Sequence, residues 1–337
     1  MPHTHGQSTR GTVVPRVLVI TYALDPTADF VLRELNERGI PFWRTDLSDF
    51  PNRSTLTAEL RPEGRWDGRM YDELRGIDLS EVRSVWWRKP TPYAFPGTMS
   101  EPERHFAASQ AKGALPGVLG TLPGTLWVNR PERNADCTKP AQLAVAARAG
   151  LRVPETLITN DPAAVAPFAA KCGGRIVTKV FGGIVHTEGG KRGQLYTRRV
   201  PPDQFGNPRI GLTAHLFQRE ITTKAYEIRV TAVAGRLFPV ALHAPHGPAR
   251  LDWRRDSSSL AHTPAELPSD VAHGIRTLLR DLGLVYAALD LIVDGDGDGD
   301  GTHYLIDVNP GGQWAWIDLT REAITHALAD LLEKGTL

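Results

Sequence analysis

Two stretches decide the fold: Ala287-Ala-Leu-Asp-Leu-Ile-Val293 and Tyr304-Leu-Ile-Asp-Val-Asn-Pro-Gly-Gly312. Both are rich in strand-forming apolar residues, and each carries one carboxylate, Asp290 or Asp307, where an unpaired charge would be costly. Asn309 lies two residues after Asp307 and therefore on the same face of a strand. Because these oxygen ligands suit Mg²⁺ carried by a nucleotide, we expect Asp290, Asp307 and Asn309 to be metal ligands of an ATP-using enzyme.

The composition is that of an ordinary globular protein. The 337 residues suffice for two or three packed units, and 41% are hydrophobic. Lys plus Arg (39) nearly balance Asp plus Glu (38), which argues against nucleic-acid binding through bulk charge. The two cysteines have no metal-type spacing, which fits a reducing, cytoplasmic location. We see neither a signal-peptide core nor an apolar run near the ~18 residues of a membrane span, and we expect no membrane association.

The amino-terminal part reads as a small α/β unit that ends near residue 125. Residues 1–12 are expected to be a disordered tail. The expected elements of the unit are a strand at 13–21, a helix at 27–38 with Ala28, Val31, Leu32 and Leu35 on one face, and strands at 40–44 and 84–87. The turn at 21–26 contains no glycine to admit a pyrophosphate, so this unit is not expected to be the nucleotide site.

The remainder alternates strands and helices. A helix should begin near Thr138, end at Gly150 and turn Leu143, Ala144 and Ala147 inward. The other expected elements are strands at 175–180 and 217–222, a hairpin of 227–234 with 237–243 about Gly235-Arg236, a long loop at 244–268, a helix at 269–282 with Val271, Ile275, Leu278 and Leu282 inward, a hairpin of 285–293 with 303–308, and a helix at 318–334.

Two lysines and a glycine-rich stretch indicate a phosphate site. Lys139 opens a helix, and Lys179 lies in the strand sequence Ile-Val-Thr-Lys-Val, where an uncompensated ammonium is unusual. Phosphate oxygens would compensate both charges. In the polar stretch that runs on to Gln194, Gly182 and Gly183 can bring backbone N–H groups close to phosphates. Taken alone, Lys139 is better explained as a surface lysine, and the glycines fit a flexible hairpin. For Lys179 the phosphate role is favoured over a lysine at a sheet edge, and the glycines that follow it strengthen the prediction of a phosphate site.

A further group of residues suits the rest of a nucleotide. The strand edge at Gln218, Glu220 and Ile221 offers backbone groups to adenine, Glu227 can bind the ribose hydroxyls, and Arg229 can contact the γ-phosphate. In isolation the pattern is better explained by an alternating strand with outward charges, and only the other features favour the nucleotide.

The long loop contains Arg250-Leu-Asp-Trp-Arg-Arg-Asp256. Its three arginines surround Trp253 and would form an anion clamp, although a solvated charged loop explains them equally well. Arg254 is our candidate for steering an acidic substrate, with Arg250 and Trp253 beside it.

An Asp/Gly tract runs from Asp294 to Gly301 and nearly fits a calcium loop. That pattern requires a glutamate at its twelfth place, where Asp307 stands, and a helix on each side. The flanks here are predicted strands, and Asp307 cannot serve two sites. We therefore interpret the tract as a hairpin tip, and a calcium-responsive interaction protein is the weaker alternative.

Taken in order, these features resemble the ATP-grasp superfamily from about residue 126 to 333. The features are Lys139, Lys179, the glycine loop, the Gln-Arg-Glu-Ile hinge, Glu227, Arg229, Asp290 and the Asp-x-Asn of 307–309. Three more stretches are similar to the ATP-grasp ribosomal peptide maturases, also called microviridin-type ligases or graspetide synthetases. They are Val85-Trp-Trp-Arg-Lys-Pro90, Leu251-Asp-Trp-Arg254 and Asn309-Pro-Gly-Gly-Gln-Trp314.

The resemblance implies a mixed α/β (α+β) ATP-grasp fold of three subdomains: an amino-terminal pre-ATP-grasp domain at 13–125, a central subdomain at 126–222 and a carboxy-terminal one at 223–337. ATP and Mg²⁺ would bind between the last two. The superfamily usually has Glu-x-Asn where this chain has Asp307, which leaves open whether one or two metal ions bind.

The family likeness also implies an activity. Such ligases activate Asp or Glu side chains of a ribosomal precursor peptide as acyl phosphates and join them to Ser/Thr hydroxyls or Lys amines, forming macrolactones or macrolactams. Arg229 and Arg254 would act in catalysis, and Arg88, Arg250 and Trp253 would contact the peptide. A leader segment on the precursor and a homodimeric enzyme are further expectations.

Two alternatives share the fold. One is an ATP-grasp ligase that adds a free amino acid to a peptide or small acid, and the other is a non-catalytic peptide-binding protein. The Trp-Trp-Arg-Lys-Pro and Asn-Pro-Gly-Gly-Gln-Trp segments favour the peptide maturase over the first, and the intact lysines and metal ligands argue against the second. The precursor, the ring pattern and the choice of ester or amide stay open.

Overall fold

The computed structural model describes residues 15–337 apart from 183–184, 189–190, 245–246 and 296–300. The described chain divides into two compact units. Unit 1 comprises residues up to 131 together with 322–337, and unit 2 comprises residues 132–321. The expected tail at 1–12 lies outside the described residues.

Unit 1 is built on a parallel sheet with strand order β2–β1–β6–β7. The bounds are β1 Val17–Thr21, β2 Phe42–Thr45, β6 Ser84–Lys89 and β7 Leu126–Val128. The first strand begins at Val17 and not at residue 13, with Pro15 and Arg16 ahead of it. A proline has no N–H to give to a strand ladder, which explains the later start. The short strand β7 was not predicted.

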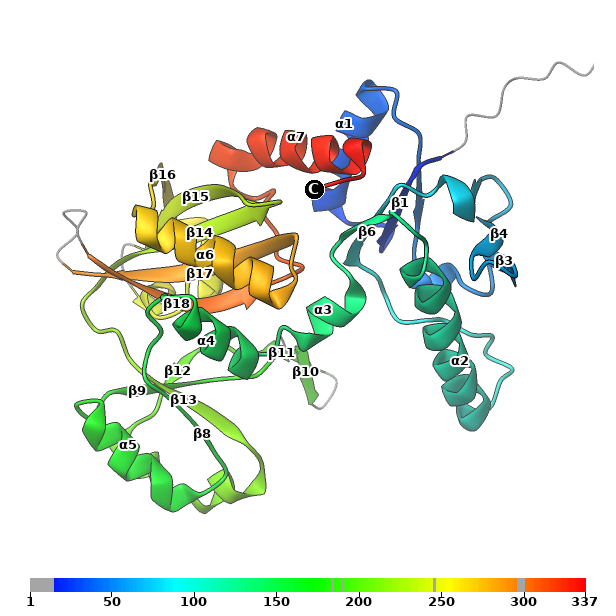
Figure 1. Ribbon diagram of the computed structural model, residues 1–337. Coiled ribbons are helices and arrows are strands. Elements are labelled where there is room, and N and C mark those ends of the chain that lie inside the picture. Colours follow the sequence, from blue (N-terminus) through cyan, green and yellow to red (C-terminus); the bar gives the residue numbers. More distant parts are fainter. Residues whose placement is uncertain (1–14, 183–184, 189–190, 245–246, 296–300) are drawn as a thin grey trace, which may run out of the picture. The chain divides into compact units, whose positions relative to one another are not determined.

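Helices and a small antiparallel sheet complete unit 1 (Figure 1). The helices are α1 Pro26–Glu37, α2 Glu101–Gly120 and the part of α7, Asp318–Lys334, from Glu322 onward; the strands are β3 Thr55–Leu60, β4 Trp66–Tyr71 and β5 Gly76–Asp78. The predicted inner face of α1 is confirmed, because its four apolar residues are buried. Ser84 Oγ donates to the carbonyl of Leu332 at 2.8 Å and so ties the last helix to the first sheet.

Unit 2 contains a four-stranded antiparallel sheet in the order β12–β9–β13–β8. The bounds are β8 Thr156–Thr159, β9 Ile176–Lys179, β12 Arg198–Arg199 and β13 His215–Arg219, with helix α5 at Val165–Lys171. Val165 and Ala169 of α5 pack against Ile176 and Phe217 of the sheet. A two-stranded hairpin, β10 Val185–Glu188 with β11 Lys191–Gln194, follows β9 in the chain.

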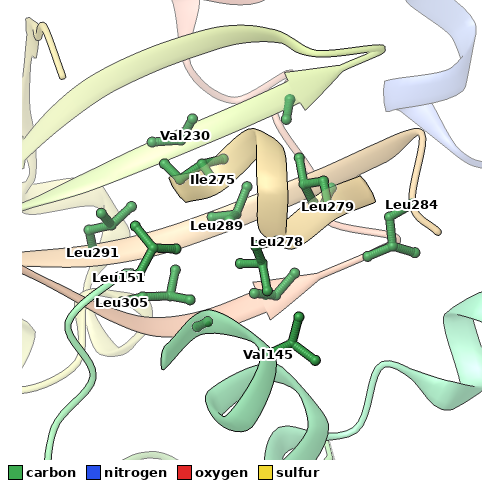
Figure 2. Packing of buried hydrophobic residues seen from close by; sticks show 14 of the residues in the cluster. Val145, Leu151, Val230, Ile275, Leu278, Leu279, Leu284, Leu289, Leu291 and Leu305 are labelled. Atoms are coloured by element: carbon green, nitrogen blue, oxygen red, sulfur yellow. The ribbon is translucent and has the colours of Figure 1, made fainter. Parts of the chain in front are cut away.

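A second antiparallel sheet of unit 2 has the order β16–β15–β14–β17–β18. Its bounds are β14 Lys224–Val233, β15 Arg236–His243, β16 Ala261–Pro264, β17 Tyr286–Asp294 and β18 Thr302–Asn309, and the helices are α3 Pro131–Asp136, α4 Lys139–Arg148 and α6 Ser269–Leu282. Figure 2 shows Ile275 and Leu278 of α6 and Val145 of α4 packed with Leu289 and Leu305 of the strands. This apolar core holds β17 and β18 in place.

Three expectations for unit 2 need correction. Helix α4 buries Gln142, Val145 and Ala146 instead of the predicted face of Leu143, Ala144 and Ala147, of which the two alanines are exposed. The β14–β15 turn is Ala234-Gly235, with φ of 46° and 81°, as two-residue hairpins require. The stretch predicted as one long loop contains a strand, β16, which extends the sheet beside β15.

Candidate active site

A cleft in unit 2 lies between the two sheets and is lined by polar and charged side chains together with apolar ones. It brings together eleven of the residues singled out from the sequence: Lys139, Lys179, Gln218, Glu220, Ile221, Glu227, Arg250, Trp253, Arg254, Asp290 and Asp307. They come from α4, both sheets and the segment after β15. An adjoining hollow shares Lys139, Lys179 and Asp307 and adds Gly182 and Asn309.

The two predicted strand carboxylates are cross-strand partners. Asp290 of β17 pairs in register with Asp307 of β18, so both side chains leave the same face of the sheet. Asp290 is only 3% exposed and accepts a hydrogen bond from Arg229 Nη1 at 2.7 Å. Arg229 Nη2 also donates to the Gln313 carbonyl at 3.2 Å. Arg229 therefore neutralises a metal-ligand candidate, and neither hydrogen bond was predicted.

Three cations surround the carboxylate of Asp307. Lys139 Nζ lies 2.6 Å from one oxygen, and Arg254 Nη1 lies 3.8 Å from the other. Burial would raise the pKa of Asp307, but the ammonium of Lys139 outweighs it and holds the pKa below its ordinary value. Burial, with repulsion from Lys139, lowers the pKa of Lys179 to about 8. The three positive charges outnumber the single negative charge of Asp307, so this end of the cleft can bind anions.

Helix α4 positions Lys139 through Gln142, a residue that the sequence analysis passed over. The buried amide of Gln142 donates to the carbonyls of Cys137 at 2.8 Å and Val308 at 2.7 Å, and it accepts from the N–H of Val308 at 3.1 Å. These bonds fix the first turn of α4 against β18, next to Asp307. A polar residue on the inner face of an otherwise apolar helix was the signal in the sequence.

A second missed residue is Lys224, which is buried and pairs with Glu227. Its ammonium also donates to the Arg250 carbonyl at 2.7 Å, and Arg250 Nη2 donates to the Lys224 carbonyl at 2.9 Å. Burial raises the pKa of Glu227 to about 7, while Lys224 acts in the opposite direction. Residues three apart in a regular strand face opposite sides, but an irregularity between Lys224 and Tyr226 brings this pair together.

The third missed residue is Asp252, which holds Arg254. Asp252 accepts from Arg254 Nε at 2.8 Å and Nη2 at 3.1 Å, a bidentate pair, and from the N–H of Thr197 at 3.0 Å. Burial opposes the charge, yet the hydrogen bonds from Arg254 lower the pKa of Asp252 to about 2. The aspartate thus links the Arg254 turn to the segment that follows β11.

Besides Arg229, three of the predicted residues do not line the cleft. Asn309 is exposed, and its side-chain oxygen accepts from the Gly311 N–H at 3.0 Å. Gly182 lines the adjoining hollow, while Gly183 lies outside the described residues. Arg88 belongs to unit 1, where its buried guanidinium is 3.6 Å from Asp25, and its contact with a peptide stays a prediction.

The structure argues against the calcium-loop alternative. The tract is flanked by the antiparallel strands β17 and β18 and not by helices. Most of the tract, residues 296–300, lies outside the described residues. Within the described part of the chain, no three His, Cys, Asp or Glu side chains converge as a ready-made metal site requires.

Comparison with known proteins bears on this architecture. Residues 16–135 match the family model of the MvdD pre-ATP grasp domain. A RiPP-associated ATP-grasp ligase from Chryseobacterium gregarium, solved with ADP and a leader and core peptide, superposes with a TM-score of 0.86 at 24% identity, over 96% of this chain and 98% of its own.

Two macrocyclases from Microcystis aeruginosa MRC are similar over nearly full length. MdnC, solved with its precursor peptide MdnA, has a TM-score of 0.79 at 25% identity, over 94% of this chain and 99% of its own. MdnB has a TM-score of 0.75 at 28% identity, over 94% and 98%. This chain is an ATP-grasp ligase that is similar to the peptide maturases. No protein with a curated description matches the ligase.

The ATP-grasp fold and the family resemblance predicted for the ligase are therefore confirmed. The division at residues 125 and 222 stays a prediction, as do the individual site roles. Over the described residues, the ligase contains no helix that is long and apolar enough to cross a membrane.

Proposed function

We propose that this ligase uses ATP to close rings in a ribosomal precursor peptide. A side-chain carboxylate of the peptide attacks the γ-phosphorus of ATP, giving an acyl phosphate and ADP. A hydroxyl or amine of the same peptide then attacks the acyl carbon, loses its proton and displaces phosphate. The observation that carries the proposal is the grouping of Lys139, Lys179 and Arg254 about Asp307, with Asp290 alongside, in one cleft.

The cleft residues suit the parts of ATP in order. Gln218, Glu220 and Ile221 serve the base, Glu227 the ribose and Lys139 with Lys179 the phosphates, supported by Gly182 and Gly183. Glu227 is buried beside a lysine, so its carboxylate can accept hydrogen bonds from two hydroxyls. The ADP in the Chryseobacterium ligase supports a nucleotide in this fold.

The donor set fits Mg²⁺ that arrives with the nucleotide. Asp290, Asp307 and Asn309 supply only oxygen, and Mg²⁺ prefers one or two carboxylates completed by phosphate and water. The described residues offer no third acidic ligand beside the two carboxylates, so phosphate oxygens have to complete the shell. When bound, Mg²⁺ would neutralise charge that develops on the phosphates. Arg229 orients Asp290 through its hydrogen bond, and its own role at the γ-phosphate is proposed as well.

The peptide end of the cleft is formed by Arg254, Arg250 and Trp253, with Arg88 as a further proposed contact. Arg254 is held bidentately by Asp252 and presents its third nitrogen, Nη1, toward Asp307. A guanidinium placed in this way can bind the peptide carboxylate and then the acyl phosphate. We further propose that the precursor is recognised through a leader segment, and that the ligase acts as a cytoplasmic homodimer.

Lys179→Ala tests the proposal, with the exposed Lys171→Ala as the matched control. Each variant is mixed with ATP, Mg²⁺ and the short peptide encoded beside its gene, and ADP release and loss of water mass are measured. Lys179→Ala is expected to lose both signals, and Lys171→Ala to keep both. Ring formation at the wild-type rate by Lys179→Ala would refute the site. Transfer of a free amino acid without water loss inside the peptide would instead establish the small-acid ligase.

A further inference from the structure

One buried atom in the cleft has no hydrogen-bond partner. Gln218 of β13 is 2% exposed, and its Oε1 is unpaired, whereas its Nε2 donates to Thr156 Oγ1 at 3.0 Å. Among the described residues that line the cleft, no other buried side-chain acceptor lacks a hydrogen-bond partner. Such atoms are rare in folded proteins and mark a position where a ligand or water supplies the missing donor.

A relay of hydrogen bonds fixes which end of the Gln218 amide enters the cleft. Thr156 Oγ1 donates to the carbonyl of Pro154 at 2.8 Å. A hydroxyl has one hydrogen, so Thr156 has none left for Gln218 and can only accept from it. If the Gln218 amide were rotated by half a turn, its Oε1 would face Thr156 Oγ1, which has no proton left to donate. Gln218 and Thr156 are cross-strand partners in β13 and β8, which keeps the relay in register.

The unpaired oxygen belongs to the face that would hold a base. Gln218 pairs in register with Val177, and Val177 lies two residues before Lys179 on the same face of β9. Val177, Ile221, Ile292 and Ile306 give the cleft apolar side chains from the strands and connections on both sides. A flat heterocycle between such side chains would place its polar edge against Gln218 while its phosphates reach the lysines.

We propose that the Gln218–Thr156–Pro154 relay selects adenine over 6-oxopurines. Adenine carries an amino group at its sixth position and can donate to Oε1. Guanine and hypoxanthine carry an oxygen there, which would face a second oxygen. The inference rests on the proposed function, because it places the base of the nucleotide in this cleft. It assigns the selection of the base to the side-chain oxygen of Gln218 and to Thr156, which does not itself contact the nucleotide.

The test is titration calorimetry of the ligase with nucleotide and Mg²⁺ and without peptide. The probes are ATP, ITP and purine riboside triphosphate, which lacks any group at the sixth position. The wild type is expected to bind ATP roughly tenfold or more tightly than the purine nucleotide, the effect of one good hydrogen bond to a buried acceptor, and ITP more weakly still. Gln218→Met keeps the side-chain volume and should bind ATP and the purine nucleotide equally.

A second variant separates the relay from the glutamine itself. Thr156→Val frees the amide to turn its Nε2 to the cleft, so the penalty against ITP should shrink roughly tenfold. Thr178→Val removes a hydroxyl that donates to a backbone carbonyl on the neighbouring strand, and it should keep the wild-type preference. Wild-type base preference in Gln218→Met or in Thr156→Val would overturn the inference and leave the proposed nucleotide site standing. Failure of the folded wild type to bind any of the three nucleotides would refute both.

Discussion

Buried carboxylates occur in both units, but their partners differ. In unit 1, Asp25 accepts from the hydroxyl of Thr21 at 2.8 Å and from the backbone N–H groups of Thr27 and Ala28, while its cationic neighbour, Arg88, is farther away at 3.6 Å. In unit 2, Asp290 and Asp307 are held by the cationic side chains of Arg229 and Lys139. Backbone donors are permanent, whereas side-chain cations can be shared with phosphate or metal. The difference separates carboxylates that shape the fold from carboxylates placed for chemistry.

The largest expected effect is that of Asp290→Asn. The substitution removes the charge of a proposed metal ligand, so ring formation and ADP release should fall by about a hundredfold or more, with the melting temperature close to wild type. The matched control, Asp281→Asn, changes an exposed aspartate and should leave both rates unchanged. Turnover by Asp290→Asn comparable with that of Asp281→Asn would show that the carboxylates of the two units do not differ in role.

Arg254→Ala should reduce ring formation more than nucleotide binding. We expect roughly a tenfold to hundredfold loss in the rate of water loss from the peptide, with the Kd for ATP changed much less, because Arg254 is proposed to bind the peptide carboxylate and the acyl phosphate. Asp252→Asn weakens the bidentate support of Arg254 and should give an intermediate loss. Rate measurement and nucleotide titration on the same preparations check both variants, and equal losses in rate and affinity would contradict the assigned role.

For Asp25, the carboxylate in unit 1, we predict a loss of stability instead of a loss of activity. Asp25→Ala removes the side-chain cap of α1 and should lower the free energy of unfolding by about 1–2 kcal/mol. Turnover per folded molecule should fall far less than in Asp290→Asn, although Asp25 also neighbours Arg88. Urea titration followed by rate measurement separates the two quantities. A loss of turnover in folded Asp25→Ala protein as large as that of Asp290→Asn would contradict the difference between the two units.

The smallest effect is a shift in pH dependence. Glu227, with a pKa of about 7, must be ionised to accept from ribose, and Lys179, with a pKa of about 8, must be protonated to bind phosphate. The pH profile of kcat/KM for ATP should therefore rise through pH 7 and fall above pH 8. Lys224→Met removes the cation that favours the charged form of Glu227, so the acid limb should move to higher pH. A limb that stays in place would exclude Glu227 as its source.

The helices and strands that short residue patterns encode could be predicted from the sequence. Helix 318–334, helix 269–282 and the hairpin of Asp290 with Asp307 all follow from periodic apolar residues with capping or turn signals, and the order of polar residues indicated the fold. The inner face of α4 was missed because Gln142 is buried by three hydrogen bonds that no apolar pattern encodes. Lys224 was missed because a strand irregularity changes which side chains share a face.

Partners that are distant in sequence set a second limit. Asp252 was read as part of a charged loop, since nothing local shows that it accepts from the N–H of Thr197. The Gln218 relay likewise depends on a cross-strand neighbour, Thr156, whose place is fixed only by the register of β8 and β13. Side-chain roles that depend on register are visible only once the sheets are assembled.

The most direct test of the central claim is a crystal structure with a non-hydrolysable ATP analogue and Mn²⁺ in place of Mg²⁺. We predict an anomalous peak from a Mn²⁺ ion bound by Asp290 and Asp307, with the phosphates beside Lys139 and Lys179. A triphosphate bound in another part of the ligase, or a metal peak remote from both aspartates, would contradict it.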